Sequence, residues 1–385
     1  MHEHMARLVA RVITLLTGVL ALTTATTGRL HAQAVYQDPI TITDGGIYTG
    51  AWQSLDPGVA AITIQTTAPV IITDSYIMSK GLLIDANYPG ADVTVVNTSG
   101  LALNPEIVGW FAGRFIEGNG ISRLVVEHNY FEGTRGVFAG RPPPGATILV
   151  RYNSVKNLSG RQSTGSGWTT SDVTPEVAQL VQFDKVTGAN AEIAWNQVIN
   201  EPYVSRTEDV INMYASAGTL ANPILIHDNY IRGAYPGNPD VDGFSGGGII
   251  ADGADTGFLK VYGNQIIETV NYGLAIADGH DNEYYGNTVL GTGLLPSGGR
   301  APAQNVGMYV NGGAAGNIVH DNTVGWYDAF GSRNDAYFPG CPDGTCSYNN
   351  IAAPEPITLT QEDAEFTTWQ NKLAANGITV GPPAR

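Results

Sequence analysis

The chain has 385 residues, with 48 glycines, 14% charged residues and 43% hydrophobic residues, a composition that suits many short strands and tight turns. Its 35 acidic and 19 basic side chains give a formal net charge of -16. This charge argues against nucleic-acid binding, which depends on basic patches that neutralise phosphates. It also argues mildly against a polyanionic glycan, unless cations or a local basic cluster intervene.

Residues 1–34 have the features of a secretory signal peptide. Arg7 and Arg11 precede an apolar stretch at 12–22, and Ala32, Gln33 and Ala34 form a small-x-small cleavage site. The apolar stretch is too short to span a bilayer comfortably, and no later segment resembles a membrane helix. We therefore expect a secreted or periplasmic protein that begins near residue 35 and has no membrane partner.

A short motif recurs along the chain, in which an apolar run ends at an Asn and a second apolar run follows. The Asn residues of the seven copies are Asn129, Asn153, Asn196, Asn229, Asn264, Asn287 and Asn322. Their spacings have a floor near 23 residues with variable additions, a pattern typical of a solenoid in which each unit is one coil. Asn suits the bend between two strands because it tolerates left-handed backbone angles. We expect the stacked Asn side chains to form an internal ladder of amide bonds.

On this repeat, over roughly residues 93–351, the chain resembles the right-handed parallel β-helix proteins of the pectate-lyase-like superfamily. The resemblance implies an all-β fold, with a single right-handed parallel β-helix over residues 35–352. Many members of that superfamily are polysaccharide lyases or glycoside hydrolases, and others are tailspikes, adhesins and sugar-chain epimerases. The fold alone therefore does not select an activity.

The two ends of the predicted helix need covering, because open strand edges pair with other chains. In the C-terminal tail, 353–385, Thr360 and Asp363 resemble a capping box, and residues 361–375 have helical spacing up to Gly377. We expect this amphipathic helix to close the last coil and residues 36–75 to cap the first. Cys341 and Cys346 enclose a Pro-Asp-Gly-Thr turn, which predicts a local disulfide in an oxidising compartment; two thiols without nearby histidines make metal binding the weaker alternative.

Four additions lengthen the coils at one point of the repeat, namely 156–178, 233–245, 291–305 and 325–347. Insertions at equal positions of a solenoid project from one edge and can wall a trough for a chain-like ligand. Aromatic residues in these loops and in the shorter connections, among them Tyr203 and Tyr235, are candidate platforms for sugar rings. The alternative is that they pack the loops against the helix.

Ionisable residues concentrate at 205–209, directly before the strand 210–214. One coil later, Asp240 and Asp242 occupy the equivalent approach. Because stacked coils lie about 4.8 Å apart, Glu208, Asp209 and Asp242 can reach the separations that glycosidases use, and crowding raises the pKa of one of them. Two alternatives stay open: a Ca²⁺ site, or solvated acids with Arg206 paired to Glu208 or Asp209.

Amides and cations complete the predicted site. Gln182 and Asn212 stand on neighbouring strands, so we expect them to bind substrate. Lys185, Arg206, Arg232 and Arg300 supply the positive charge that β-elimination needs to stabilise an enolate.

Histidines and acids outside this segment receive different interpretations. His280 lies outside the register in which His227-Asp228 and His320-Asp321 recur, which makes it a candidate proton carrier. Asp252 and Asp278 each precede a Gly, and we interpret them as turn residues.

Together these features predict a secreted enzyme that depolymerises a polysaccharide. A lyase that acts by β-elimination on a uronate-containing glycan is favoured over an inverting glycoside hydrolase that uses Glu208 or Asp209 with Asp242. A third alternative is a non-catalytic glycan-binding or surface protein with the same solenoid. The sequence contains no motif of a named lyase or of the polygalacturonase-type hydrolases.

Overall fold

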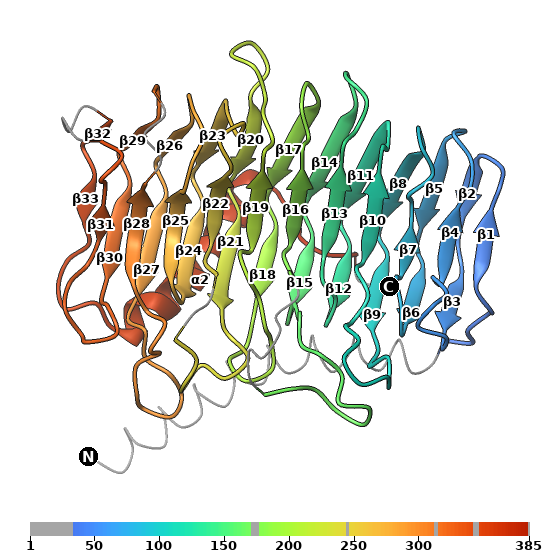
Figure 1. Ribbon diagram of the computed structural model, residues 1–385, viewed down its shortest axis with the longest axis horizontal. Coiled ribbons are helices and arrows are strands. Elements are labelled where there is room, and N and C mark those ends of the chain that lie inside the picture. Colours follow the sequence, from blue (N-terminus) through green and yellow to red (C-terminus); the bar gives the residue numbers. More distant parts are fainter. Residues whose placement is uncertain (1–33, 171–176, 244–245, 312–314, 342–345, 384–385) are drawn as a thin grey trace.

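A computed structural model describes residues 34–170, 177–243, 246–311, 315–341 and 346–383. The described chain winds into a right-handed parallel β-helix, in which each coil contributes one strand to each of three parallel sheets of 11 strands (Figure 1). The predicted fold is therefore confirmed. The predicted signal peptide lies almost entirely in residues 1–33, outside the described residues.

The sheets are named here in the order in which a coil visits them. Sheet 1 contains β1 (Ile40–Ile42), β4 (Ile62–Ile64), β7 (Ile84–Asp85), β10 (Ile116–Asn119), β13 (Val137–Gly140), β16 (Val181–Asp184), β19 (Ile211–Tyr214), β22 (Ile249–Asp252), β25 (Tyr272–Ile276), β28 (Val306–Val310) and β31 (Ala336–Tyr337). Sheet 2 contains β2 (Gly46–Tyr48), β5 (Val70–Thr73), β8 (Asp92–Val96), β11 (Arg123–Glu127), β14 (Thr147–Arg151), β17 (Asn190–Ala194), β20 (Ile224–His227), β23 (Leu259–Tyr262), β26 (Glu283–Tyr285), β29 (Ile318–His320) and β32 (Ser347–Tyr348). Sheet 3 contains β3 (Ala51–Ser54), β6 (Tyr76–Ser79), β9 (Ser99–Ala102), β12 (Tyr130–Glu132), β15 (Ser154–Lys156), β18 (Gln197–Ile199), β21 (Tyr230–Ala234), β24 (Gln265–Thr269), β27 (Thr288–Gly291), β30 (Thr323–Trp326) and β33 (Ile351–Ala352).

Side chains along each short strand point alternately to the core and to the outer face. In β16, Val181 and Phe183 lie in the hydrophobic core, and Gln182 between them points to the other side of the sheet. The parallel register repeats this division on the next coil, where Ile211 pairs with Val181 and Asn212 with Gln182. The register therefore carries one row of outward side chains along the whole sheet.

The Asn residues of the repeat form the predicted ladder at the bend between sheets 2 and 3. Each Nδ2 donates to the Oδ1 of the next Asn at 2.9–3.1 Å, from Asn129 to Asn322 and on to Asn350. The same Oδ1 atoms accept the backbone N–H of the preceding Asn. From Asn129 to Asn322 the ladder is buried, so these bonds stabilise a bend that water cannot reach.

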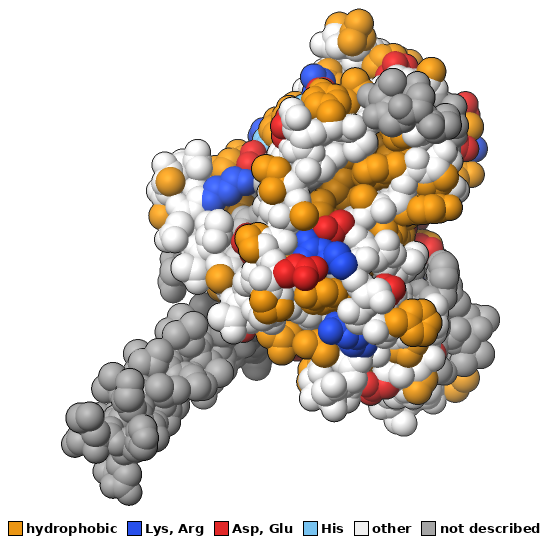
Figure 2. Space-filling view, turned by 90° about the vertical axis from the view of Figure 1, so that its left-hand side faces the viewer, with side chains coloured by type: hydrophobic (Ala, Val, Ile, Leu, Met, Phe, Trp, Pro, Cys, Tyr) orange, Lys and Arg blue, Asp and Glu red, His pale blue; other side chains and the backbone are white. Residues whose placement is uncertain are grey.

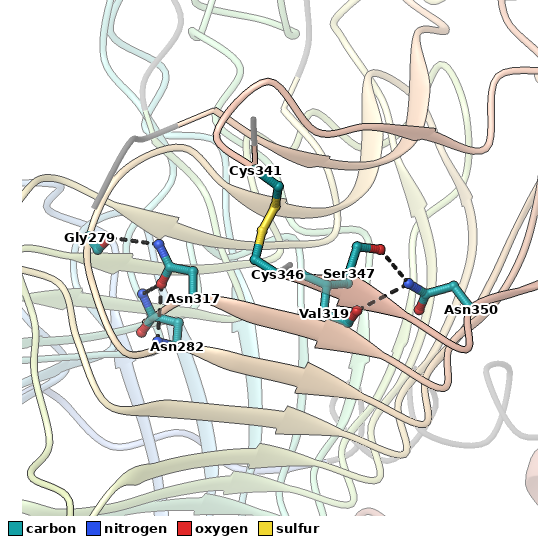
Figure 3. The surroundings of a disulfide bond; sticks show 8 residues. All are labelled: Gly279, Asn282, Asn317, Val319, Cys341, Cys346, Ser347 and Asn350. Atoms are coloured by element: carbon teal, nitrogen blue, oxygen red, sulfur yellow. Dashed lines mark hydrogen bonds between the residues drawn. A yellow bond between two sulfur atoms is a disulfide. The ribbon is translucent and has the colours of Figure 1, made fainter. Parts of the chain in front are cut away.

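A shorter ladder occupies the bend between sheets 1 and 2. Asn282 donates to the Oδ1 of Asn317 at 3.1 Å, and Asn317 donates to the carbonyl of Gly279 at 2.8 Å (Figure 3). The predicted disulfide joins Cys341 and Cys346 close to this bend, with Cα atoms 5.5 Å apart. The recurring Asn motif in the sequence did not predict this second ladder of Asn282 and Asn317.

The loops that lengthen the coils connect sheet 3 to sheet 1 and project from one edge of the helix (Figure 1). They span 157–180, 235–248, 292–305 and 327–335, and 103–115 is a further one. The fourth loop is shorter than the predicted insertion 325–347, because β31 begins at Ala336. Residues 36–75, expected to cap the first coil, form the first coils themselves.

Helix α2 (Leu359–Asn376) starts at a capping box of Thr358 and Gln361, two residues before the predicted one, and ends at Gly377 with φ 64°. It lies on the outer face of sheet 3, where Trp369 donates to the Gln197 side chain at 3.1 Å and Lys372 to the Gly263 carbonyl at 2.6 Å. The expectation that it closes the last coil is therefore wrong. Sheet 3 carries an apolar outer patch, and burying this patch selects the position of the helix. The described residues include no helix that is long and apolar enough to cross a membrane.

The last coil leaves the edges of β31, β32 and β33 without a further coil. Figure 2 views this end and shows hydrophobic side chains beside a group of acidic and basic ones. Tyr337 and Ile351 are 61% and 62% exposed there. Arg333 forms ion pairs with Asp335 at 2.5 Å and Glu355 at 3.3 Å.

Candidate functional site

The outer face of sheet 1 brings polar and aromatic residues from successive coils into one row. The register places Phe138, Gln182, Asn212, Ile250, Ala275 and Tyr309 side by side in this order. A second row, nearer the strand ends, contains Asp184, Tyr214 and Asp252. We call these two rows, with the residues that contact them, the sheet 1 face.

Asn212 is the centre of a hydrogen-bonded network on this face. Its Oδ1 accepts from Gln182 Nε2 at 3.2 Å, and its Nδ2 donates to Asp209 Oδ2 at 3.0 Å. Hydrogen bonding from Asn212 also lowers the pKa of Asp252, so its amide lies between two carboxyl groups. The structure thus brings together three of the predicted residues, Gln182, Asp209 and Asn212.

Asp209 is the buried member of the network. Its Oδ1 accepts from the backbone N–H of Gly247 at 3.0 Å and from the hydroxyl of Tyr272. Burial raises the pKa of Asp209 although these bonds and that of Asn212 favour the charged form. Because both oxygens of Asp209 already accept hydrogen bonds, this carboxyl group orients its neighbours and does not contact a ligand.

Asp252 is the carboxyl group that this network presents to solvent. It is the last residue of β22, it is half-buried, and it points outward because Ile249 and Ala251 fill the core. Burial raises the pKa of Asp252, and the charge of Asp278 from the next coil raises it further. Asp209 and Asp252 also interact electrostatically.

The interpretation of Asp252 and Asp278 as turn residues is only part of their description. Gly253 and Gly279 do adopt positive φ angles of 90° and 103°, as predicted. Yet the charge of Asp278 acts on Asp252 across neighbouring coils. The signal that could have identified Asp252 is its position in the alternation of β22, two residues beyond the outward Ile250.

An apolar floor continues this face toward the C-terminal coils. Ile250, Tyr272, Ala275 and Val306 form a cluster with Tyr309 packed against it, and the Tyr272 and Tyr309 rings meet edge to face at 5.1 Å. On the other side of Asp252, the Tyr214 side chain is 44% exposed. Acids between apolar and aromatic surfaces suit a sugar chain, whose ring faces are apolar and whose edges carry hydroxyl groups.

Glu208 and Arg206 lie beside Asp209 in the chain but contact other groups. Glu208 accepts from Gln179 Nε2 at 3.1 Å. Arg206 is buried, and its backbone pairs with that of the loop 157–180 at Ser159. Asp209 contacts Asn212, Gly247 and Tyr272 instead.

Asp240 and Asp242 belong to the loop 235–248. Asp242 Oδ2 accepts from the backbone N–H of Asn238 at 2.6 Å, and Asp240 accepts from the Ser297 hydroxyl at 2.7 Å. Both carboxyl groups thus hold loops together. The structure does not bring Asp242 into the network of Asp209, because the chain rises into a loop between Ala234 and Ile249.

The predicted cations are spread over the molecule. Lys185 is exposed at the bend that follows β16. Arg232 lies on the outside of sheet 3 and pairs with Glu268 at 2.7 Å and Asp363 at 2.8 Å. Arg300 donates to the Thr292 carbonyl and lies 5.2 Å from the centre of the Tyr327 ring.

The remaining predicted residues have separate surroundings. His280 lies at the bend after β25, where Nδ1 is 2.9 Å from Asp281 Oδ2. Tyr235 is buried against the loop 292–305, so it packs that loop and offers no platform to a ligand. Tyr203 is 38% exposed in the connection between β18 and β19.

The two repeated His-Asp pairs are structural, as interpreted. His227 and His320 belong to a stack of rings on sheet 2, with centroids 4.7 Å apart for His227 and Tyr262 and 5.3 Å for Tyr285 and His320. Each His also contacts two carboxylates.

No group of three or more His, Cys, Asp or Glu side chains in the described part of the chain is arranged to hold a metal ion. A hollow of about 330 Å³ lies at the first coil, lined by Tyr36, Gln53 and Val59 among others, and none of its lining residues belongs to the sheet 1 face.

Comparison with known proteins gave no match: no family model, no curated protein and no solved structure matches the chain.

Proposed function

We propose that the protein is a secreted glycoside hydrolase that cleaves a glycan lying along the sheet 1 face. Asp252 is the general acid, because its pKa is raised and it reaches solvent. Asp278 is the carboxylate that activates water, and Asp209 with Asn212 positions Asp252. The observation that carries this proposal is that the register sets Asp252 and Asp278 on neighbouring coils, where the negative charge of Asp278 raises the pKa of Asp252.

The spacing of the coils supports a two-carboxylate mechanism. Neighbouring strands of a sheet are about 4.8 Å apart, and glycosidases hold their two carboxyl groups roughly 5 to 9.5 Å apart. Protonated Asp252 can donate its proton to the leaving-group oxygen, and the negative charge of Asp278 favours the protonated form of Asp252. In such enzymes the surroundings of two carboxyl groups give them different pKa values, so that one acts as the acid and the other as the carboxylate.

The charge of the face indicates a neutral glycan. Asp278 contributes negative charge, and the nearby Asp184 carboxylate is paired with Arg141 at 2.7 Å. A polyuronate would bring further negative charge to this surface in a protein whose net charge is already -16. Exposed Tyr214 on one side of Asp252 and Tyr309 on the other would stack against uncharged sugar rings.

A lyase acting on uronate is the second candidate, and two arginines favour it. Arg114 and Arg135 lie two residues before β10 and β13, the place that Asp209 has before β19. Arg114 lies 5.1 Å from the centre of the Phe138 ring, which belongs to the sheet 1 face. Arg135 is half-buried and could reach a uronate two coils from Asp209, whereas Arg114 is buried and supports Arg135 by donating to its carbonyl at 3.0 Å. Membership of the pectate-lyase-like superfamily and export are parts of the same proposal, supported by the parallel β-helix and the disulfide.

Digestion of a glycan panel in ¹⁸O-labelled water tests the proposal. Purified protein is incubated with neutral and uronate-containing polysaccharides, and products are examined by mass spectrometry and ultraviolet absorbance. Label at the new anomeric position without absorbance is the expected result for a hydrolase, whereas unsaturated ends without label would establish β-elimination. Saturable binding without any cleavage would overturn both and favour a glycan-binding protein.

A further inference from the structure

Glu362 of helix α2 is a carboxyl group with no exposed surface. It meets the base of the loop 292–305, where the backbone N–H of Thr292 donates to Oε1 at 2.6 Å and the Thr292 hydroxyl donates to Oε2 at 3.2 Å. Its other neighbour is Glu268 of β24, since Arg232 donates both to Glu268 and to Asp363, the residue after Glu362; the charge and hydrogen bonding of Glu268 raise the pKa of Glu362. Two carboxyl groups can share a hydrogen bond only when one of them carries a proton.

The charges around this pair leave the proton on Glu362. Arg232 of β21 donates to Glu268 at 2.7 Å and to Asp363 of α2 at 2.8 Å, so its single charge already serves two carboxylates. Arg300 is directed to the Thr292 carbonyl and the Tyr327 ring. If Glu362 were ionised, the single positive charge of Arg232 would have to compensate three carboxylates in a buried site.

The other titratable groups at this contact do not supply a countercharge to Glu362. The hydroxyl-bearing rings of Tyr230 and Tyr235 are buried beside Glu268. Glu365 of α2 accepts from Gln265 Nε2 at 2.6 Å. Lys372, the single basic residue of the helix, forms an ion pair with Asp228 at 2.6 Å farther along.

We propose that α2 is a latch, held on sheet 3 by one proton shared between Glu268 and Glu362, and that it opens more readily as the solution becomes alkaline. Opening uncovers the apolar patch of Tyr230, Ile267 and Leu290 under the helix. It also releases Thr292, which is the first residue of the loop 292–305.

The direction of the pH dependence follows from the closed state holding the proton more tightly. Burial, and then Glu268, raise the pKa of Glu362 from 4.5 to about 8. The contribution of this proton to closure is therefore complete below pH 4.5 and is lost as the pH rises to about 8. Within that window the opening constant rises roughly tenfold per pH unit, and beyond it the dependence ends.

Hydrogen exchange of the full chain tests the latch. Protection of residues 359–376, corrected for intrinsic exchange rates, is measured by mass spectrometry at several pH values between about 5 and 9. We expect protection in the wild type to fall roughly tenfold per pH unit until about pH 8. Glu362→Gln should remove this slope, because the amide oxygen still accepts from the Thr292 N–H and the amide N–H donates to Glu268, without a titrating proton.

Glu365→Gln is the matched control, since it changes a carboxylate of the same helix outside the shared pair and should keep the wild-type slope. If Glu362→Gln fails to fold, Glu268→Gln provides the second arm, because an amide there donates to an ionised Glu362 and should also flatten the slope. Protection that is independent of pH in the wild type, or equal slopes in the wild type and a folded variant, would overturn the proposal.

Discussion

Asn264 and Asn287 are joined twice within the buried ladder: Nδ2 of Asn264 donates to Oδ1 of Asn287 at 2.9 Å, and the backbone N–H of Asn264 donates to the same oxygen at 3.0 Å. A side-chain oxygen thus serves both the amide and the backbone of the preceding coil. The ladder therefore sets the register of sheets 2 and 3 as well as contributing stability.

Replacing Asn264 with Leu should destabilise the protein by at least about 2 kcal/mol, because each buried polar group left without a partner costs about 1–3 kcal/mol. The backbone N–H of Asn229 and the carbonyl of Ile226 both lose a bond to this side chain. Urea unfolding measures the change. Asn305→Leu at an exposed position is the control, with an expected effect within about 0.5 kcal/mol; equal losses in the two variants would contradict the buried ladder.

Asp252→Asn should lower the turnover of a cleaved glycan by roughly 10² to 10⁴ with little change in thermal stability, because general acid catalysis contributes about that factor. Initial rates on the best substrate of the panel provide the measurement. Asp255→Asn, an exposed acid in the same turn, should keep the wild-type rate. Wild-type turnover of Asp252→Asn would reject the assigned acid, and Glu208→Gln and Asp242→Asn would then test the acids predicted from the sequence.

The pKa of Asp252 should move in opposite directions in two variants. Asp278→Asn removes a charge that raises this pKa and should lower it, whereas Asn212→Leu removes a hydrogen bond that lowers it and should raise it. Carboxyl-carbon NMR titration of labelled aspartates follows both shifts. In a hydrolase that needs protonated Asp252, activity is lost as the pH rises through this pKa, so Asn212→Leu should extend activity to higher pH. Shifts of the same sign in both variants would show that the network is described wrongly.

His227 should make part of the stability depend on pH. Its contacts with Asp228 and Glu192 raise its pKa above 6.5, although burial opposes them. The contribution is complete below pH 6.5 and is lost as the pH rises through the raised pKa. His227→Phe keeps a ring for the stack, so it should remove this loss from urea-unfolding midpoints measured across that window, while His280→Phe should retain it. A wild-type midpoint that does not fall above pH 6.5 would contradict the assignment.

The same cluster predicts a loss of stability in acid. Contacts with His227 lower the pKa of Glu192 below 4.5 and, together with those of Lys372, that of Asp228 below 3.8. Their contribution is present above those ordinary values and is lost as the pH falls through the lowered ones. Lys372→Met should reduce the part that depends on Asp228, which urea unfolding near pH 3 would measure.

The recurring Asn and the alternation of short apolar runs were sufficient to predict the parallel β-helix, because both are local consequences of stacking one coil on another. Asn129 to Asn322 form the ladder that the sequence predicts, and the turn glycines after Asp252 and Asp278 adopt the expected backbone angles. The edge from which the loops project was predicted for the same reason, since equal positions in a repeat lie on one side. Residue types at regular spacing thus determined the fold, the bends and the placement of the insertions.

The partners of individual side chains depended on contacts between coils and across loops, which no spacing in the sequence encodes. Asp242 was predicted at the repeat position of Asp209, but the register gives that position to Gly247, and Asp242 bonds to its own loop. Arg232 pairs with Asp363 of α2, a helix that packs back along sheet 3. Asp252 and Asp278 look like ordinary turn residues until the register sets them on neighbouring coils. The tertiary structure decided these points because burial and electrostatic coupling depend on which surfaces pack together. The burial of apolar area determines which surfaces do so.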